Sequence, residues 1–159
     1  LLAVACYVLR REPRLPAAAK ADAVVVLKAQ RRLLLLHGEE TEKVYAIALG
    51  RTPHGHKFRE GDGRPPEGTY RVDSRNRRSR FHLALHISYP NESDRRRAAA
   101  AGVSPGGDIM IHGLPNGLGW VGKLHRLVDW TDGCIAVTDD EVEEIWRAVD
   151  DGTPIHILP

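Results

Sequence analysis

Two residues of this sequence combine a reactive side chain with a setting that suits acyl transfer. Cys134 follows Gly133 at the start of the apolar stretch 135–137, and His112 ends the apolar stretch 109–111. A free thiol with a pKa of about 8.5 is mostly protonated at neutral pH, so it becomes a nucleophile when a nearby imidazole accepts its proton. Gly133 has no side chain and would let a substrate carbonyl approach the thiol. The pair therefore predicts a cysteine–histidine acyl-transfer site.

The residues alone leave a simpler interpretation open. Cysteine is among the most buried residue types, so Cys134 can equally be a structural thiol and His112 an unrelated side chain. The second cysteine, Cys6, lies in the apolar stretch 1–9, and this separation does not predict a disulfide framework. A lone cysteine with a suitable histidine elsewhere is a candidate nucleophile instead.

The elements that would carry these residues are mostly strands. The apolar and β-branched runs predict strands over 23–27, 33–36, 44–49, 69–73, 81–89, 108–112 and 154–158, with the first two in a hairpin. A polar helix is expected over 92–101 and a short helix after Trp120. The last helix has the clearest signals, since Thr138 and Glu141 form a capping box and an apolar stripe follows up to Gly152. The fold class is therefore mostly β with two or three helices.

Between these elements runs a long connection, 50–68, which is rich in glycine and proline. A connection of this length is usually functional or disordered. It contains His54 and His56, but alternate histidines in such a loop do not make a metal site without further ligands. We expect neither a metal nor another cofactor.

Composition restricts the function classes. The chain has 159 residues and a net charge of +2, which does not favour a nucleic-acid partner. The segment 1–20 is interpreted as the remnant of a signal sequence or membrane anchor followed by a linker, and 21–159 as one catalytic domain. Membrane contact is expected only through the N-terminal segment, and the domain is expected to be a monomer.

A group of arginines lies between two of the predicted strands. Arg75 and Arg78 belong to it and are candidates for binding a substrate carboxylate, because a guanidinium offers a planar fork of donors. A solvated loop is the alternative interpretation of the same residues.

Residues from about 21 to 159 resemble the YkuD-type L,D-transpeptidase catalytic domain, in its YafK-like branch. The matching strings occur in the family's order, and together they are specific although each alone is weak. They are Gly50-x-x-Pro53-x-Gly55-x-Lys57, Gly61-Asp62-Gly63, Pro66-Glu67-Gly68-x-Tyr70, Ile87-Ser88-Tyr89-Pro90-Asn91, Ile109-Met110-Ile111-His112-Gly113 and Asp129-Trp130-Thr131-Asp132-Gly133-Cys134-Ile135-Ala136-Val137-Thr138.

The resemblance implies a β-sandwich or barrel catalytic domain with Cys134 as nucleophile and His112 as general base. The carbonyl of Gly113 would orient the far nitrogen of His112, and the turn of Thr131, Asp132 and Gly133 would support the site. Two positions depart from most of the wider family, because Asp132 stands where a histidine is usual and Ala136 where an arginine is usual. The YafK-like branch is similar to this chain at both positions. A proline, Pro65, also replaces a usual threonine.

The resemblance further implies a peptidoglycan stem peptide as substrate and a location in the periplasm or cell envelope. The thioester would be resolved by an amine of a second stem or of a wall-anchored lipoprotein, and carbapenems would inhibit. A cysteine L,D-hydrolase or amidase acting on stem peptides or lipoprotein links is an alternative, since water would resolve the same thioester. A non-catalytic wall-binding domain is the alternative from another class, and the presence of both Cys134 and His112 argues against it.

Overall fold

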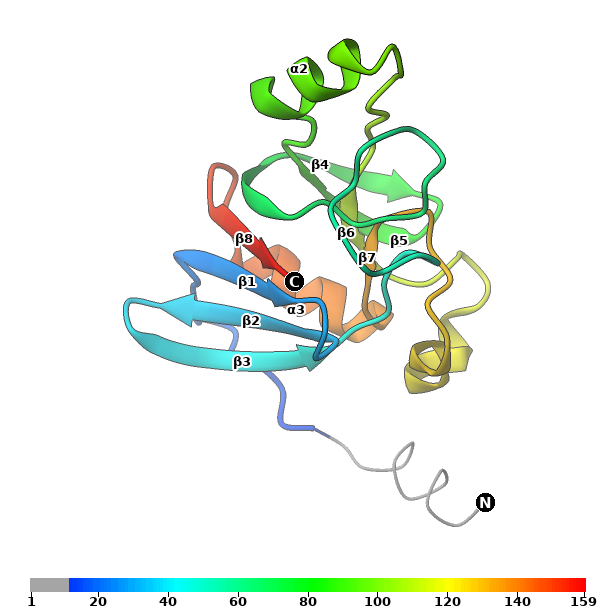
Figure 1. The fold of residues 1–159 in the computed structure, drawn as a ribbon. Coiled ribbons are helices and arrows are strands. Elements are labelled where there is room, and N and C mark those ends of the chain that lie inside the picture. The colour runs from blue at the N-terminus through cyan, green and yellow to red at the C-terminus, as the bar shows by residue number, and fades with distance from the viewer. Residues whose placement is uncertain (1–11) are drawn as a thin grey trace.

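The computed structural model describes residues 12–159, and eight strands form a mixed sheet around one core (Figure 1). The strands are β1 (Ala23–Leu27), β2 (Arg32–His37), β3 (Glu40–Ala46), β4 (Gly68–Ser79), β5 (His82–Ile87), β6 (Met110–His112), β7 (Ile135–Ala136) and β8 (Pro154–Leu158). Their order in the sheet is β3-β2-β1-β8-β4-β5-β6-β7. The predicted hairpin is present, with β1 antiparallel to β2.

The long strand β4 joins the two parts of the sheet. The first part of β4, from Gly68 to Arg71, pairs with β8, and its second part pairs with β5. Beyond β3 the chain returns to the other end of the sheet, where Ala48 bridges to Ala136 and Gly50 bridges to Thr131. These bridges bring the start of the loop 50–68 against the turn that precedes Cys134.

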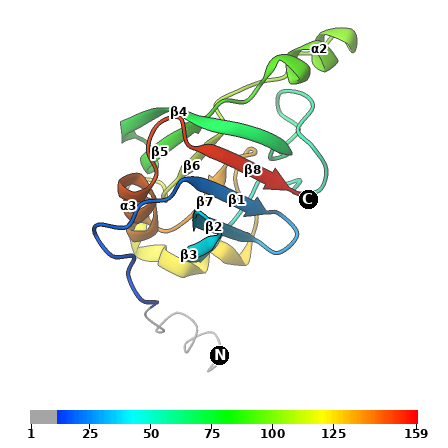
Figure 2. The ribbon, with the colours of Figure 1, turned by 90° about the vertical axis from the view of Figure 1, so that its left-hand side faces the viewer.

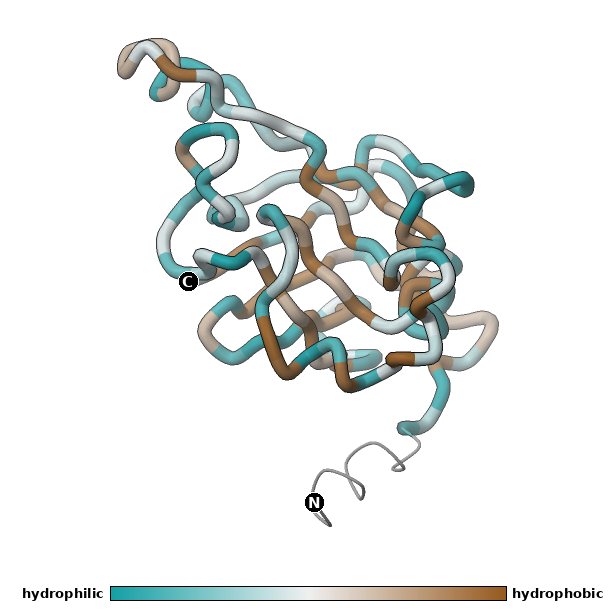
Figure 3. Tube along the Cα trace, turned by 90° about the vertical axis from the view of Figure 1, so that its right-hand side faces the viewer, coloured by the Kyte–Doolittle hydropathy of each residue, from teal (hydrophilic) through white to brown (hydrophobic). Residues whose placement is uncertain are grey.

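Alternating side chains fill the core. In β1, Val24 and Val26 are fully buried, and in β2 Leu33 and Leu35 are fully buried, as expected for strands with one inward face. The hydropathy colouring of Figure 3 shows hydrophobic segments along the strands in the centre of the molecule and hydrophilic ones in the outer loops. Burial of this apolar face is the main force that holds the sheet together.

Two α-helices and a 3₁₀ segment accompany the sheet within residues 12–159. Helix α2 (Glu92–Ala100) is capped by Asn91 and extends away from the sheet (Figure 2). Helix α3 (Asp139–Ala148) begins with the predicted capping box of Thr138 and packs its buried residues against β5 and β6. The segment η1 (Gly119–Leu127) is 3₁₀ and is interrupted at Gly122. The expectation of a mostly β fold with two or three helices is confirmed.

Two strands and one helix have other boundaries in the structure than the sequence predicts. Strand β4 continues to Ser79, so Arg75, Arg77 and Arg78 lie on a strand and not in a solvated loop. The sequence does not predict this extension, because its residues are polar on both faces of the strand. At this edge of the core, pairing with β5 stabilises the strand without burial of its side chains. The third strand, β3, spans 40–46 and not 44–49, and the last helix ends at Ala148, four residues before Gly152.

The start of the described chain packs against α3. Leu15 is buried, and its backbone N–H donates to the Glu144 carboxylate at 3.1 Å. Between residues 12 and 159, no helix is long and apolar enough to cross a membrane. The interpretation of 1–20 as an export segment and linker falls largely on residues 1–11, which lie outside the described residues.

Candidate active site

Cys134 and His112 come from neighbouring strands. His112 ends β6 and Cys134 directly precedes β7, and these two strands are parallel, with Ile111 opposite Ile135 and His112 opposite Ala136. Because side chains alternate along a strand, Cys134 lies on the same face as His112. The register places Cys134 level with Met110, on the same face as His112 and two positions from it along the strands.

His112 is held in one orientation and one tautomer. Its Nδ1 lies 2.7 Å from the carbonyl oxygen of Gly113, and since a carbonyl only accepts, Nδ1 carries the proton. The side chain is almost fully buried, and this burial lowers the pKa of His112. Its ring packs against Phe81 at a centroid distance of 4.5 Å. His112 is therefore a neutral imidazole whose Nε2 keeps a lone pair, as a general base requires.

The thiol of Cys134 is protonated at rest. Cys134 is half-buried, and its Sγ donates to the backbone carbonyl of Asp108 at 3.3 Å. Burial raises the pKa of Cys134 to about 11, a hydrogen bond from the Met110 backbone lowers it, and the Asp132 and Asp108 carboxylates raise it further. A neutral thiol thus faces the same side of the sheet as a neutral imidazole.

The turn before Cys134 is held by backbone and hydroxyl contacts. The Thr131 hydroxyl donates to the Cys134 carbonyl at 2.7 Å and accepts from the Gly133 N–H at 3.3 Å. Gly133 has a φ of +119°, and a Cβ there would lie 2.7 Å from the carbonyl oxygen of Arg64. This position therefore requires glycine for two independent reasons.

Asp132, by contrast, points into solvent. Its carboxylate forms an ion pair with Arg51 at 3.3 Å, and both side chains are mostly exposed. An exposed pair of this kind contributes little to stability.

Asp139, which no sequence motif singled out, organises the loop after His112. The Asp139 carboxylate accepts a hydrogen bond from the Leu114 N–H at 2.8 Å. It lies so close to Gly113 that a Cβ there would be 2.6 Å from it. Asp139 is the first residue of α3, and the capping box was the only signal near it in the sequence. It holds the backbone whose Gly113 carbonyl orients His112.

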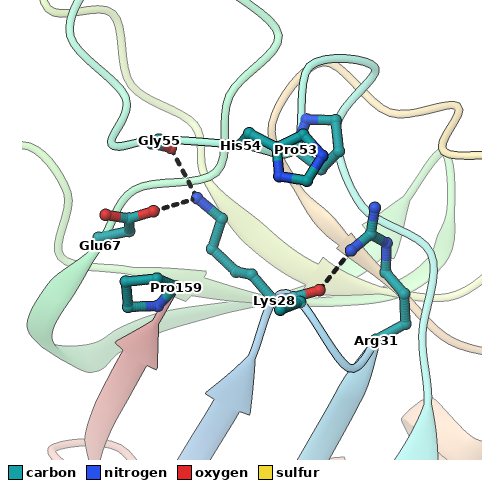
Figure 4. Close-up of a pocket in the computed structure, with 8 residues that line it drawn as sticks. Lys28, Arg31, Pro53, His54, Gly55, Glu67 and Pro159 are labelled. Atoms are coloured by element: carbon teal, nitrogen blue, oxygen red, sulfur yellow. Dashed lines mark hydrogen bonds and ion pairs between the residues drawn. The ribbon is translucent and has the colours of Figure 1, made fainter.

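The loop 50–68 is anchored by a buried lysine. Lys28 is 2% exposed, and its Nζ donates to the Gly55 carbonyl at 2.6 Å and to the Glu67 carboxylate at 2.8 Å (Figure 4). His54 lines the small cavity beside this lysine and is exposed. His56 lies elsewhere, with Nδ1 accepting from the Glu67 N–H and Nε2 donating to Asp94 at 3.0 Å. The loop is thus fastened to β1 and to α2.

No metal site is visible in the part of the chain that the structure describes. Among residues 12–159, no group of three or more His, Cys, Asp or Glu side chains is placed to hold an ion.

The structure gives Arg75 and Arg78 different surroundings. The guanidinium of Arg75 donates to Asp151 at 2.5 Å and to the Trp146 carbonyl at 2.6 Å, and it also donates to the Val149 carbonyl. Arg75 therefore satisfies carbonyls at the end of α3. Arg78 is exposed on β4. Binding of a substrate carboxylate by either arginine stays a prediction.

An apolar cavity of about 320 Å³ lies between η1 and the segment that follows β6. Trp130 lines it and also contacts the His112 ring edge-on, at a centroid distance of 5.7 Å. Trp120, the other tryptophan between the two motifs, is 80% exposed. Of these two tryptophans, Trp130 is the one that lines the cavity.

The comparisons with known proteins concern the domain as a whole. A family model described as the YkuD L,D-transpeptidase catalytic domain matches residues 21–157. The helical cell shape determining protein Pgp2 from Campylobacter jejuni shares 26% identity, with a TM-score of 0.63, over 85% of this chain and 46% of that one. Bd1075 from Bdellovibrio bacteriovorus shares 23% identity, with a TM-score of 0.60, over 90% of this chain and 49% of that one.

A more distant structure has the same fold. L,D-transpeptidase 1 from Mycobacterium tuberculosis shares 13% identity, with a TM-score of 0.54, over 86% of this chain and 60% of that one. The chain spans about half the length of the Campylobacter and Bdellovibrio structures. Among curated proteins, none matches it. The match over residues 21–157 shows that the chain belongs to the YkuD family of L,D-transpeptidase catalytic domains.

Proposed function

We propose that this domain is a peptidoglycan L,D-transpeptidase that works through a thioester on Cys134. The observation that carries the proposal is the parallel pairing of β6 and β7, which presents Cys134 and the base His112 on one face. The hydrogen bond from His112 Nδ1 to Gly113 supports it, because it leaves Nε2 free of a proton.

The reaction follows from the protonation states of the two side chains. Because both groups are neutral at rest, the Sγ proton moves to His112 Nε2 as sulfur attacks the carbonyl carbon of an L-to-D peptide bond. The resulting tetrahedral intermediate collapses, and the terminal D-residue leaves as an amine after taking the proton from His112. The acyl group then remains on Cys134 as a thioester.

The second half-reaction regenerates the thiol. An amine of a second stem peptide, or of a wall-anchored lipoprotein, attacks the thioester and forms a new amide. His112 accepts the amine proton and returns one to the departing sulfur. Water in place of the amine gives hydrolysis from the same intermediate, so the acceptor decides between transpeptidase and hydrolase.

The setting we propose is the cell envelope, where peptidoglycan is found. Pgp2 is described as a helical cell shape determining protein, and mycobacterial L,D-transpeptidases were solved with imipenem and with a faropenem-derived adduct. By analogy, we propose that the domain influences cell shape and that carbapenems acylate Cys134. Their strained amide resembles the acyl donor.

Purified protein and a tetrapeptide muropeptide with an amine acceptor test the proposal. Wild-type protein should release the terminal D-residue and form the new amide, whereas Cys134→Ala should lose both activities and keep its fold by circular dichroism. Asp132→Asn is the matched control in the same turn and should stay active. Release that continues in folded Cys134→Ala would contradict the thioester mechanism. Muropeptide analysis of a deletion strain would then identify the acceptor.

A further inference from the structure

A buried ion pair lies inside the loop 50–68, and the proposed reaction does not use it. The Lys57 ammonium is 3.0 Å from the Asp62 carboxylate, and the two side chains are 3% and 9% exposed. Lys57 also donates to the Arg59 carbonyl at 3.2 Å. Burying two charges costs about as much free energy as their attraction returns, so such a pair calls for a reason other than stability, such as a fixed local conformation.

Asp62 holds the chain around it through backbone hydrogen bonds. Its carboxylate accepts from the N–H groups of Phe58, Arg59 and Arg64, at 2.8, 3.1 and 3.1 Å. Burial raises the pKa of Asp62, but the backbone hydrogen bonds and the one from Lys57 outweigh it and leave this pKa below its usual value. Asp62 is therefore ionised at neutral pH and is the acceptor around which this stretch of the loop folds.

The turn 58–64, which Asp62 holds, packs directly against Gly133, the residue before the nucleophile. A Cβ at Gly133 would lie 2.7 Å from the carbonyl oxygen of Arg64, so the two backbones are in contact. A Cβ at Gly50 would lie 2.1 Å from the Gly63 carbonyl oxygen and 2.8 Å from the Gly133 Cα. Only glycines allow so close an approach, and a change in the course of the turn would be transmitted to Gly133.

The same turn also contacts the segment that accepts the hydrogen bond of the thiol. The Glu60 N–H donates to the Ser104 carbonyl at 2.8 Å, and a Cβ at Gly106 would lie 3.1 Å from the Glu60 Cα. This segment continues to Asp108, whose carbonyl accepts from Cys134 Sγ at 3.3 Å. The turn thus supports both the backbone before the nucleophile and the acceptor of its thiol.

We propose that the buried pair of Lys57 and Asp62 positions the Cys134 thiol for attack, because it fixes the turn against which the backbone of the nucleophile packs. Neither side chain needs to touch the substrate, since both act through the turn 58–64. A misplacement of about 1 Å can lower a rate about 10²-fold, so a loosened turn should lower kcat and leave KM almost unchanged. The inference rests on the proposed function, since it concerns the same nucleophile.

Steady-state kinetics of Lys57→Met protein test the proposal. Methionine fills much of the space of the lysine stem without its charge, so Asp62 loses one partner. kcat should fall about 10–100-fold, with KM within about threefold of wild type. Lys43→Met is the matched control, because Lys43 pairs with Glu144 in a second buried ion pair, at 2.5 Å between β3 and α3. Both variants should lower the melting temperature by about 5–15 °C, and Lys43→Met should keep kcat.

Alkylation of Cys134 by iodoacetamide gives a second readout that does not depend on catalysis. Burial is the main cause of the raised pKa of Cys134, and the Lys57 charge lowers this pKa only weakly. A loosened turn exposes the thiol, so alkylation at pH 8, well below the melting temperature, should be about three- to tenfold faster in Lys57→Met and unchanged in Lys43→Met. A lower kcat together with a more reactive thiol is the signature of lost positioning.

The outcomes separate this proposal from the proposed function. Unchanged kcat in folded Lys57→Met, an equal fall of kcat in Lys43→Met, or unchanged alkylation in Lys57→Met would each overturn the proposal. If Lys57→Met does not fold, Asp62→Asn takes its place with the same expected results. If wild-type protein transfers no acyl group, the proposed function fails, and the alkylation rates still decide whether the pair holds the thiol in place.

Discussion

The resting protonation state of Cys134 predicts how its reactivity depends on pH. Burial raises the thiol pKa from 9.0 to about 11, so only about 10⁻⁴ of the protein is thiolate at pH 7, roughly a hundredfold less than for a thiol of pKa 9. A thiolate of higher pKa is intrinsically more nucleophilic, by about eightfold for two pKa units. Alkylation by iodoacetamide at pH 7 should therefore be about tenfold slower than for an exposed thiol of pKa 9.

The pH profile of this alkylation is the decisive measurement. The rate at Cys134, mapped by mass spectrometry to separate it from Cys6, should rise tenfold per pH unit up to at least pH 10. Asp132→Asn should move the profile to lower pH, because the Asp132 carboxylate raises the thiol pKa. A plateau below pH 8 would refute the reasoning, since it would mean that a thiolate–imidazolium pair already exists at rest.

Carbapenem acylation separates the role of His112 from that of the thiol pKa. Wild-type protein should form one adduct on Cys134. His112→Ala should slow its formation about 10²–10⁴-fold near neutral pH, with partial recovery at higher pH as the thiol ionises unaided. Intact-mass spectrometry over time measures both rates. Equal rates in the two proteins would show that His112 is not the base.

Three further predictions concern stability. Gly133→Ala should lower the free energy of unfolding in urea by about 1–3 kcal/mol and abolish activity, because Gly133 has a positive φ and a carbonyl lies close to it. Gly107→Ala, where a Cβ meets open space, should change neither stability nor activity. Arg75→Ala should lower the free energy of unfolding by about 1–3 kcal/mol, because it leaves carbonyls at the end of α3 unpaired. Arg78→Ala should leave the free energy of unfolding unchanged. A raised KM in Arg78→Ala would support the binding of a substrate carboxylate by Arg78. Burial lowers the folded pKa of His125 to about 4, so its stabilising contribution, on the order of 3 kcal/mol, is complete above pH 6.5 and is lost as the pH falls towards 4. Between pH 7 and pH 4, urea unfolding should show a larger loss of stability in wild type than in His125→Phe, because the buried His112 loses stability in both proteins.

Much of the domain was predictable from local sequence signals. The β-branched and apolar runs of β1 and β2 and the capping box of α3 act within a few residues, so they are readable without the fold. The strings around His112 and Cys134 likewise predicted the family, and the family match confirms it. Their placement at strand ends was also visible, because apolar stretches stop at His112 and start after Cys134.

The tertiary structure alone determined how the strands that carry His112 and Cys134 pair. β6 and β7 have three and two residues, too few for a sequence pattern to specify their partner or register, and their pairing depends on the strands around them. The neutral state of Cys134 depends on burial by residues distant in sequence, and the donors of Arg75 are used by the end of α3. The unpaired Nε2 of His125 is likewise a property of its neighbours. Long-range packing determines desolvation and hydrogen-bond partners, and the type of a residue by itself does not specify them.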